Sequence, residues 1–100
     1  MIARHWHGYA RADRAGDYEA HLREATLPSL TRIDGFVDAS ILKRPAGNGV
    51  EFLIVTRWQS MDAIRQFAGT DVDAAVVPPE VEDMMIDYDR RVAHYEVLEP

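Results

Sequence analysis

The sequence predicts one α+β domain whose elements follow the order strand, helix, strand, strand, helix, strand. The chain has 100 residues, which is enough for a single hydrophobic core. Apolar side chains alternate along several short segments and recur at helical spacing along two others. Clusters of glycine and proline separate some of these segments. We therefore expect one domain over residues 1–100, with a four-stranded antiparallel sheet and both helices on one of its faces.

The first third of the chain predicts a strand followed by an interrupted helix. Residues 2–10 alternate and are rich in aromatic side chains, as in a strand. Apolar residues from Tyr18 onward fall mostly on one helical face, and Asp13 is placed to cap the start of this helix. Pro28 lies within the pattern, so we expect a kink or a restart there. Gly35 can adopt the left-handed conformation that ends a helix.

Residues 36–44 and 50–58 predict a hairpin whose loop is slightly longer than the tight two-residue type. The second strand of this hairpin is apolar on both faces. One face carries Phe52, Ile54, Thr56 and Trp58, and the other face carries Leu53 and Val55. Helices can cover only one face of the sheet, and a solvated face would show polar residues. We therefore expect a second copy of the chain to pack against the open face, giving a homodimer.

A second helix and a last strand complete the predicted order. Ser60 is placed as the N-cap of this helix and Gly69 as its end. Residues 80–86 follow two prolines and predict one or two further helical turns. Residues 89–98 predict the final strand, which is expected to lie beside the first strand in the sheet.

Charge and composition exclude several classes of partner. The formal net charge of −6 argues against nucleic acid, which requires a basic surface, and against an anionic membrane surface. The chain has no cysteine, which rules out a disulfide, a thiolate nucleophile and a zinc–thiolate site. No apolar run approaches the roughly 20 residues of a membrane span, and the first residues lack the pattern of a signal peptide. We therefore expect a cytoplasmic protein.

The segment Phe52–Phe67, with the sequence FLIVTRWQSMDAIRQF, carries a family resemblance. It resembles the strand-to-helix segment of the antibiotic biosynthesis monooxygenase (ABM) domain family, in which a tryptophan closes the third strand and a serine two residues later caps the next helix. Trp58 and Ser60 match this motif, and the Gly35-Phe36 junction and the strand at residues 94–97 also fit. The resemblance covers nearly the whole chain. It implies a ferredoxin-like fold, a homodimer of the dimeric αβ-barrel type, and a pocket between sheet and helices in each subunit.

The resemblance also makes the haem-degrading branch of the family testable on this sequence. That branch has an asparagine late in the first strand, a tryptophan nine residues after the strand-ending tryptophan, and a haem-ligating histidine ten residues further on. This chain has Gly8, Phe67 and Val77 near or at those places. We therefore expect no haem, and we expect no other cofactor.

Two functions remain open. The first, implied by the resemblance, is a cofactor-independent monooxygenase acting on a small aromatic phenol or quinol. A base removes the phenolic proton, the resulting anion reacts with O2, and a polar group stabilises the oxygenated intermediate. The second is a non-catalytic dimeric module that binds a small apolar ligand or serves as an interaction domain.

His7 and His94 are the candidate catalytic residues. Imidazole titrates near neutral pH, which suits the removal of a proton from a phenol. The first and last strands are neighbours in the predicted sheet, so the two side chains could face one site. His5 and His7 with His94 could in principle hold a divalent metal, but no carboxylate stands at a diagnostic spacing. We therefore expect no metal, and favour histidines that line a pocket or the dimer interface.

Aromatic and cationic side chains form the candidate substrate pocket. Its residues are Trp6, Arg57, Trp58, Phe67 and Tyr95. Arg4 and Arg57 could bind an anionic group of the substrate, or could pair with carboxylates at the surface. The aromatic side chains could equally fill the core, as large aromatics do in small domains. The sequence leaves both alternatives open.

Overall fold

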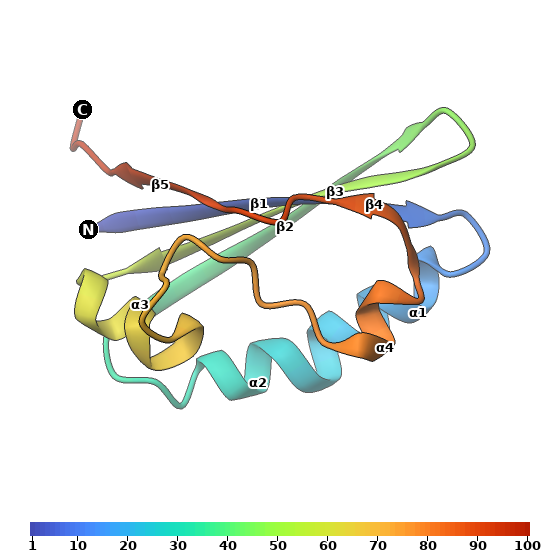
Figure 1. Cartoon of the computed structure of the whole chain (residues 1–100). Coiled ribbons are helices and arrows are strands. Elements are labelled where there is room, and N and C mark those ends of the chain that lie inside the picture. Colours follow the sequence, from blue (N-terminus) through green and yellow to red (C-terminus); the bar gives the residue numbers. More distant parts are fainter.

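A sheet with helices against one face forms the domain, as Figure 1 shows for the computed structural model, which describes residues 1–100. The elements are β1 (Ile2–Arg11), α1 (Ala15–His21), the π-helical segment η1 (Leu22–Thr26), α2 (Leu27–Leu30), β2 (Phe36–Ala46), β3 (Gly49–Trp58), α3 (Met61–Ala68), α4 (Pro79–Glu82), β4 (Met85–Tyr88) and β5 (Ala93–Glu96). The other face of the sheet carries no helix. The predicted α+β fold of the ferredoxin-like type is therefore confirmed.

β1 pairs with three other strands, all of them antiparallel to it. The strand order is β2-β3-β1-β4, and β5 pairs with the first half of β1. Of the single final strand expected over residues 89–98, only β5 forms, and the additional strand β4 precedes it, separated from it by residues 89–92. The separation has a physical reason. The Asp89 backbone N–H donates to the His7 carbonyl at 2.9 Å, and Trp6 Nε1 donates to the Asp89 carbonyl at 2.8 Å, so side-chain and irregular backbone bonds replace the ladder there.

The segment before β4 also differs from its prediction. Only residues 79–82 are helical, as α4, so one turn forms out of the one or two predicted, and β4 begins at Met85 within the range expected to be helical. Met84 and Met85 are both buried against the core. Their burial turns the chain onto the sheet, because an exposed helix would leave these two side chains in water.

The β2–β3 hairpin is tighter than predicted. Its strands extend to Ala46 and from Gly49, which leaves a two-residue loop in place of the longer one expected. Gly47 has a φ of +55°, the left-handed conformation that such short turns require. The Tyr9 hydroxyl fastens the turn to β1 by donating its proton to the Ala46 carbonyl, and Asn48 Oδ1 lies 3.1 Å from the same hydroxyl oxygen.

The first helix begins later than predicted and changes its winding. It starts at Ala15, and Asp13 pairs with Arg11 at 3.5 Å instead of capping it, so that prediction is wrong. The kink expected at Pro28 takes the form of the π-helical turn η1 just before it. A wider turn of this kind is a usual response where the helical hydrogen-bond ladder is disturbed.

The second helix follows its prediction. The Ala63 backbone N–H donates to Ser60 Oγ at 3.2 Å, which confirms the N-cap. Gly69 follows the last residue of α3 with a φ of +83° and ends the helix, also as predicted. α3 therefore packs at a fixed position after Trp58, which is fully buried.

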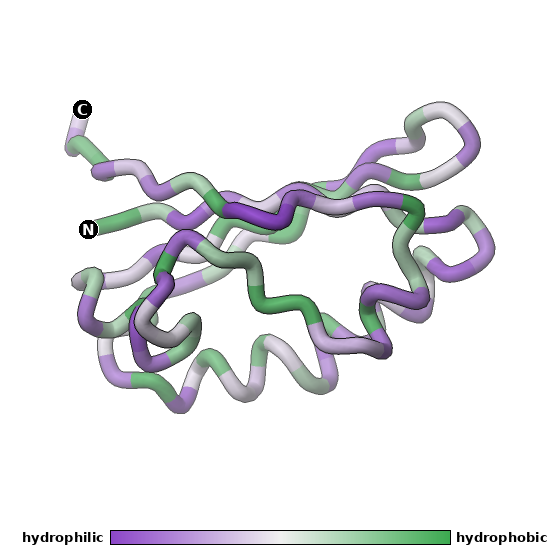
Figure 2. Tube along the Cα trace, viewed as in Figure 1, coloured by the Kyte–Doolittle hydropathy of each residue, from purple (hydrophilic) through white to green (hydrophobic).

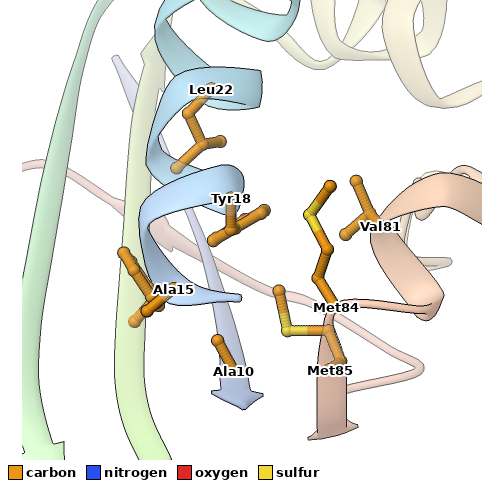
Figure 3. Close-up of a cluster of buried hydrophobic side chains, with 8 residues drawn as sticks. Ala10, Ala15, Tyr18, Leu22, Val81, Met84 and Met85 are labelled. Carbon is orange, nitrogen blue, oxygen red and sulfur yellow. The ribbon is translucent and has the colours of Figure 1, made fainter. Parts of the chain in front are cut away.

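Two buried clusters lie between the helices and the sheet. Figure 3 shows the first, in which Tyr18 of α1 and Leu22 of η1 lie across from Val81 and Met85. The second cluster gathers around Trp58 on β3. The alternation predicted for β3 is confirmed, because its even-numbered residues face the helices.

Figure 2 shows an apolar stretch in the irregular segment between α3 and α4, where the chain runs between sheet and helices. This segment supplies one wall of the cavity described below. None of the helices has both the length and the hydropathy needed to cross a bilayer.

Candidate functional site

An apolar cavity lies between the helix-covered face of the sheet and the helices. Its volume is about 80 Å³, and ten of its fifteen lining residues are hydrophobic. Arg4 and Trp6 reach it from β1, because alternate residues of a strand point to the same face. Tyr18 and His21 reach it from α1, where residues three apart share a face. Residues 76–78 close it from the segment between α3 and α4.

Arg4 is the buried cation of this cavity, with 4% of its surface exposed. Its Nη1 donates to the Val72 carbonyl oxygen at 2.5 Å and to His94 Nε2 at 3.0 Å. Its Nη2 donates to the Ala74 carbonyl oxygen at 2.9 Å. The guanidinium carbon lies 5.7 Å from the centre of the Phe67 ring, a cation–π contact. These partners are carbonyls, an imidazole and an aromatic ring, so no carboxylate bonds directly to the charge.

His94 links Arg4 to Asp73. Because its Nε2 accepts from Arg4, its proton is on Nδ1, which donates to Asp73 Oδ1 at 3.1 Å. Burial, and then the charge of Arg4, lower the pKa of His94, while Asp73 acts in the opposite direction. Burial also lowers the pKa of Arg4 to about 10, again against the effect of Asp73. Arg4, His94 and Asp73 therefore form a hydrogen-bonded row. At neutral pH it consists of a cation, a neutral imidazole and a carboxylate.

His21, Thr26 and Thr56 are the other polar side chains that line the cavity, together with the hydroxyl-bearing Tyr18. Thr56 Oγ1 accepts a hydrogen bond from Trp58 Nε1 at 2.8 Å, so its own hydroxyl proton can be donated elsewhere. Burial raises the pKa of Tyr18, which keeps its hydroxyl protonated. His21 is the single imidazole in the lining and hence its candidate proton acceptor.

Part of the predicted pocket is brought together at this cavity. Trp6 and Phe67 both line it. Trp58 is fully buried, and its indole stacks on the Phe67 ring with 6.1 Å between ring centres, so it supports the wall from behind. His94 does not line the cavity but contacts Arg4, which does.

The remaining predicted residues lie on the other face of the sheet. They are His7, Arg57 and Tyr95. Arg57 and Tyr95 lie opposite Ala3 of β1, and odd-numbered residues of β1 point away from the face that carries Arg4. His94 lies opposite Arg4 itself. The expectation that His7 and His94 face one site is therefore corrected: the two imidazoles lie on opposite faces.

On that open face the predicted residues make surface contacts. His7 Nδ1 lies 3.1 Å from Asp89 Oδ2, and Arg57 Nη1 donates to Asp38 Oδ1 at 2.9 Å. Tyr95 is 55% exposed. For Arg57, the structure therefore shows the surface pair that was the alternative to a role in substrate binding.

Two features of the cavity were missed in the sequence. Tyr18, His21 and Leu22 share one helical face, a spacing that could have placed His21 beside the apolar residues. Asp73 lies in an irregular segment and meets His94 across 21 residues of chain, which no local pattern indicates. Arg4 was considered for an anionic group, and the structure puts it inside the cavity.

Comparisons with known proteins agree on the fold. The model of a family described as antibiotic biosynthesis monooxygenase matches residues 1–78. A solved structure from Deinococcus radiodurans, provisionally named as such an enzyme, has 18% sequence identity and a TM-score of 0.71, covering 100% of this chain and 95% of its own. A second, from Bacillus cereus and also provisionally named, has 19% identity and a TM-score of 0.61, covering 99% and 92%. At these identities the two likenesses show the shared fold. No curated protein matches the chain.

Proposed function

Since the chain belongs to the antibiotic biosynthesis monooxygenase family, we propose that it is a cofactor-independent monooxygenase acting on a small aromatic phenol or quinol. The observation that carries this proposal is the buried Arg4 guanidinium on the wall of an apolar cavity, with no carboxylate bonded to it. Such a cation favours an anionic ligand, because an apolar surrounding strengthens the attraction between opposite charges.

The proposed reaction uses the substrate as its own reductant. Loss of the phenolic proton gives an electron-rich phenolate, which passes electrons to O2 and forms a carbon–oxygen bond at an ortho or para ring carbon that bears hydrogen. Protonation of the peroxide and loss of water break the O–O bond and leave a quinone. One oxygen atom of O2 enters the product and the other leaves as water, so no external reductant is consumed.

Residues on the cavity wall suit the first steps of this reaction. His21 is the proposed base for the phenolic proton. Arg4 supplies the positive charge that stabilises the anionic substrate. His94 is occupied by Arg4 at one nitrogen and Asp73 at the other, so we assign it the role of holding Arg4 and not the role of base. Trp6 and Phe67 provide apolar surface for the ring.

We also propose that the protein forms a homodimer through the helix-free face of the sheet. Leu42 of β2 and Tyr95 of β5 are 49% and 55% exposed on this face, and Leu53 of β3 lies directly opposite Leu42. Apolar side chains at the centre of an open sheet favour a covering partner. The cavity lies on the opposite face, so dimerisation leaves it intact.

The alternative is a non-catalytic module that binds a small ligand. The volume of about 80 Å³ supports this alternative, because it is below the roughly 300–1,000 Å³ of typical ligand pockets. In that case Arg4 would bind an anion without any reaction following. The two functions differ in whether O2 is consumed.

Oxygen consumption tests the proposed reaction. We expect a panel of hydroquinones and anthrones to be oxidised in air and not under anaerobic conditions. With isotopically labelled O2, mass spectrometry should find one labelled oxygen atom in each product. Products and rates that are the same with and without O2 would overturn the enzyme and leave the binding module.

Variants of the cavity residues connect the reaction to the site. We expect Arg4→Gln to lower kcat/KM by at least roughly a hundredfold, as loss of a charge-stabilising donor does in other enzymes. His21→Gln should lower kcat by a similar factor. Arg23→Gln, at an exposed position, is the matched control and should keep full activity. Circular dichroism checks that each variant is folded.

A further inference from the structure

Only some of the N–H donors of the Arg4 guanidinium have hydrogen-bond partners in the protein. A guanidinium has five N–H donors. Val72, Ala74 and His94 take three of them, two on Nη1 and one on Nη2. The N–H on Nε and one N–H on Nη2 therefore have no partner in the protein.

The two unused donors lie on Nε and Nη2, two nitrogens bonded to the same carbon of the guanidinium. Val72 and Ala74 accept from different terminal nitrogens, Nη1 and Nη2 respectively. His94 takes the second donor of Nη1. What remains is one N–H on Nε and one on Nη2, and donors on these two nitrogens are those with which arginine binds the two oxygens of a carboxylate.

The unused Nε donor of Arg4 is accessible. No fully buried polar side-chain atom in the protein lacks a hydrogen-bond partner. Nε of Arg4 has no protein partner, so it keeps accessible surface even though Arg4 as a whole is 4% exposed. Because Arg4 lines the cavity, we place the accessible surface of Nε on the cavity side.

No carboxylate of the protein competes with a ligand carboxylate for Arg4 inside the cavity. Its lining contains no Asp or Glu, and Asp73 reaches Arg4 only through His94. A buried cation without a bonded anion is costly, and a carboxylate of the ligand offsets that cost. The other walls, among them Trp6, Phe67 and Val77, are apolar and suit an aromatic ring.

We propose that the substrate is a single-ring hydroxylated aromatic carboxylic acid, whose carboxylate is bound by Nε and Nη2 of Arg4. This inference rests on the proposed function for the reaction, but its binding part stands alone. The small volume selects one ring over a fused polycyclic system. The carboxylate fixes the ring against Arg4, and the hydroxyl remains for His21.

A ligand series on the unmodified protein tests the binding. By isothermal titration calorimetry at pH 7.5, 2,5-dihydroxybenzoate should bind at least about tenfold more tightly than its methyl ester and than hydroquinone, because only the acid can accept both charge-assisted bonds. The acid should also shift the NMR signal of the Arg4 Nε–H, and the ester should not. Equal affinities for acid, ester and hydroquinone would overturn the inference.

Variants locate the carboxylate. Arg4→Lys keeps the positive charge but lacks the paired N–H donors of a guanidinium. We therefore expect the ratio of the affinities for acid and ester to fall at least about tenfold. Arg23→Lys, at an exposed position, should keep the full preference. A preference unchanged in folded Arg4→Lys would place the carboxylate elsewhere. Should Arg4→Lys fail to fold, the ligand series and the Nε–H signal decide alone.

Oxygen uptake separates this inference from the proposed function. Hydroquinone consumed as efficiently as 2,5-dihydroxybenzoate at low concentration would refute the carboxylate and leave the monooxygenase standing. Tight binding of the acid without oxygen uptake would refute the monooxygenase and support the carboxylate site. Selective binding and oxygen uptake with the acid together would support both.

Discussion

Arg4 carries a full positive charge into the interior of a small domain, and its hydrogen bonds explain how the fold tolerates this. Moving a cation out of water is unfavourable unless its donors are satisfied. Each hydrogen bond to a charged group recovers about 1.5–3 kcal/mol, and Arg4 makes three of them. The partners come from the segment before α4 and from β5, so the same residue that lines the cavity also holds its wall.

Gly8 sets the position of the Trp6 indole. A Cβ at Gly8 would lie 2.4 Å from Cη2 of Trp6 and 3.2 Å from Sδ of Met85. The indole cannot move freely, because its Nε1 is bonded to the Asp89 carbonyl at 2.8 Å. We therefore expect Gly8→Ala to lower the free energy of unfolding by roughly 1–3 kcal/mol. Urea unfolding followed by tryptophan fluorescence measures this.

Gly16→Ala is the matched control for this glycine. Gly16 lies in α1, and a Cβ there would meet no atom within 4 Å. We expect this change to raise the free energy of unfolding by roughly 0.5–1 kcal/mol, as alanine is the better helix former. Equal stability of Gly8→Ala and the unmodified protein would contradict the placement of the Trp6 ring.

At the scale of elements, the chain between α3 and α4, which forms one wall of the cavity, has little regular structure. A few side-chain and backbone hydrogen bonds hold it in place. Arg4 binds two of its carbonyls. Arg91 Nη1 donates to Asp71 Oδ2 at 2.9 Å, and the Val92 backbone N–H donates to the Asp73 carbonyl at 2.8 Å. The wall is thus attached to β1 and to the β4–β5 connection, and those bonds determine how firmly the cavity is closed.

His94 makes this attachment dependent on pH. Its pKa is lowered in the folded protein from an ordinary value of 6.5, so the unfolded chain takes up a proton at higher pH than the folded one. The stability that this imidazole contributes is complete above pH 6.5 and is lost as the pH falls through the folded pKa. We expect His94→Gln, which keeps a neutral acceptor for Arg4, to lose less stability between pH 7.5 and 5.5 in urea unfolding.

Asp73→Asn provides the comparison for this pH dependence. Asp73 raises the pKa of His94, so its removal should lower that pKa further and steepen the loss of stability on acidification. Identical pH dependence in the unmodified protein, His94→Gln and Asp73→Asn would contradict the row formed by Arg4, His94 and Asp73.

The elements that sequence reasoning predicted are those specified by neighbouring residues. The cap at Ser60 and the end at Gly69 depend on one turn of chain each, and both are confirmed. The separation of β4 from β5 depends on bonds between Asp89 and the distant β1, which no local pattern reveals. The hairpin loop was misjudged because Pro45 and Ala46 belong to β2 despite the turn-like composition around them.

The same distinction explains the site. Trp6 and Phe67 were predicted from the aromatic content and line the cavity. His7 was expected on the same face of the sheet as His94, because the first and last strands were predicted to be neighbours. The register between the strands could not be predicted, and a shift of one residue in register moves a side chain to the other face. His21 was missed because the candidates were sought among strand histidines, whereas it lies on α1.

At the scale of the whole molecule, one face of the sheet is open and partly apolar. We expect the unmodified protein to be a dimer at micromolar concentration, measured by light scattering coupled to size exclusion. Leu42→Glu should give a monomer, because it places a charge on an exposed apolar position of that face. Thr31→Glu, exposed just after α2, is the control and should remain dimeric. A monomeric unmodified protein would contradict the proposed interface.

The pairing of β1 with β4 and β5 has a consequence for folding order. β1 meets residues more than 80 positions later, through Trp6 with Asp89 and Arg4 with His94. During synthesis β1, β2 and β3 leave the ribosome before β4 and β5, so a three-stranded sheet can assemble while one edge of β1 is still unpaired. Contacts of such large sequence separation slow folding. The hydrogen bond between the Arg4 guanidinium and the His94 imidazole therefore forms only in the final stage of folding. Closure of the cavity is then among the last events of folding.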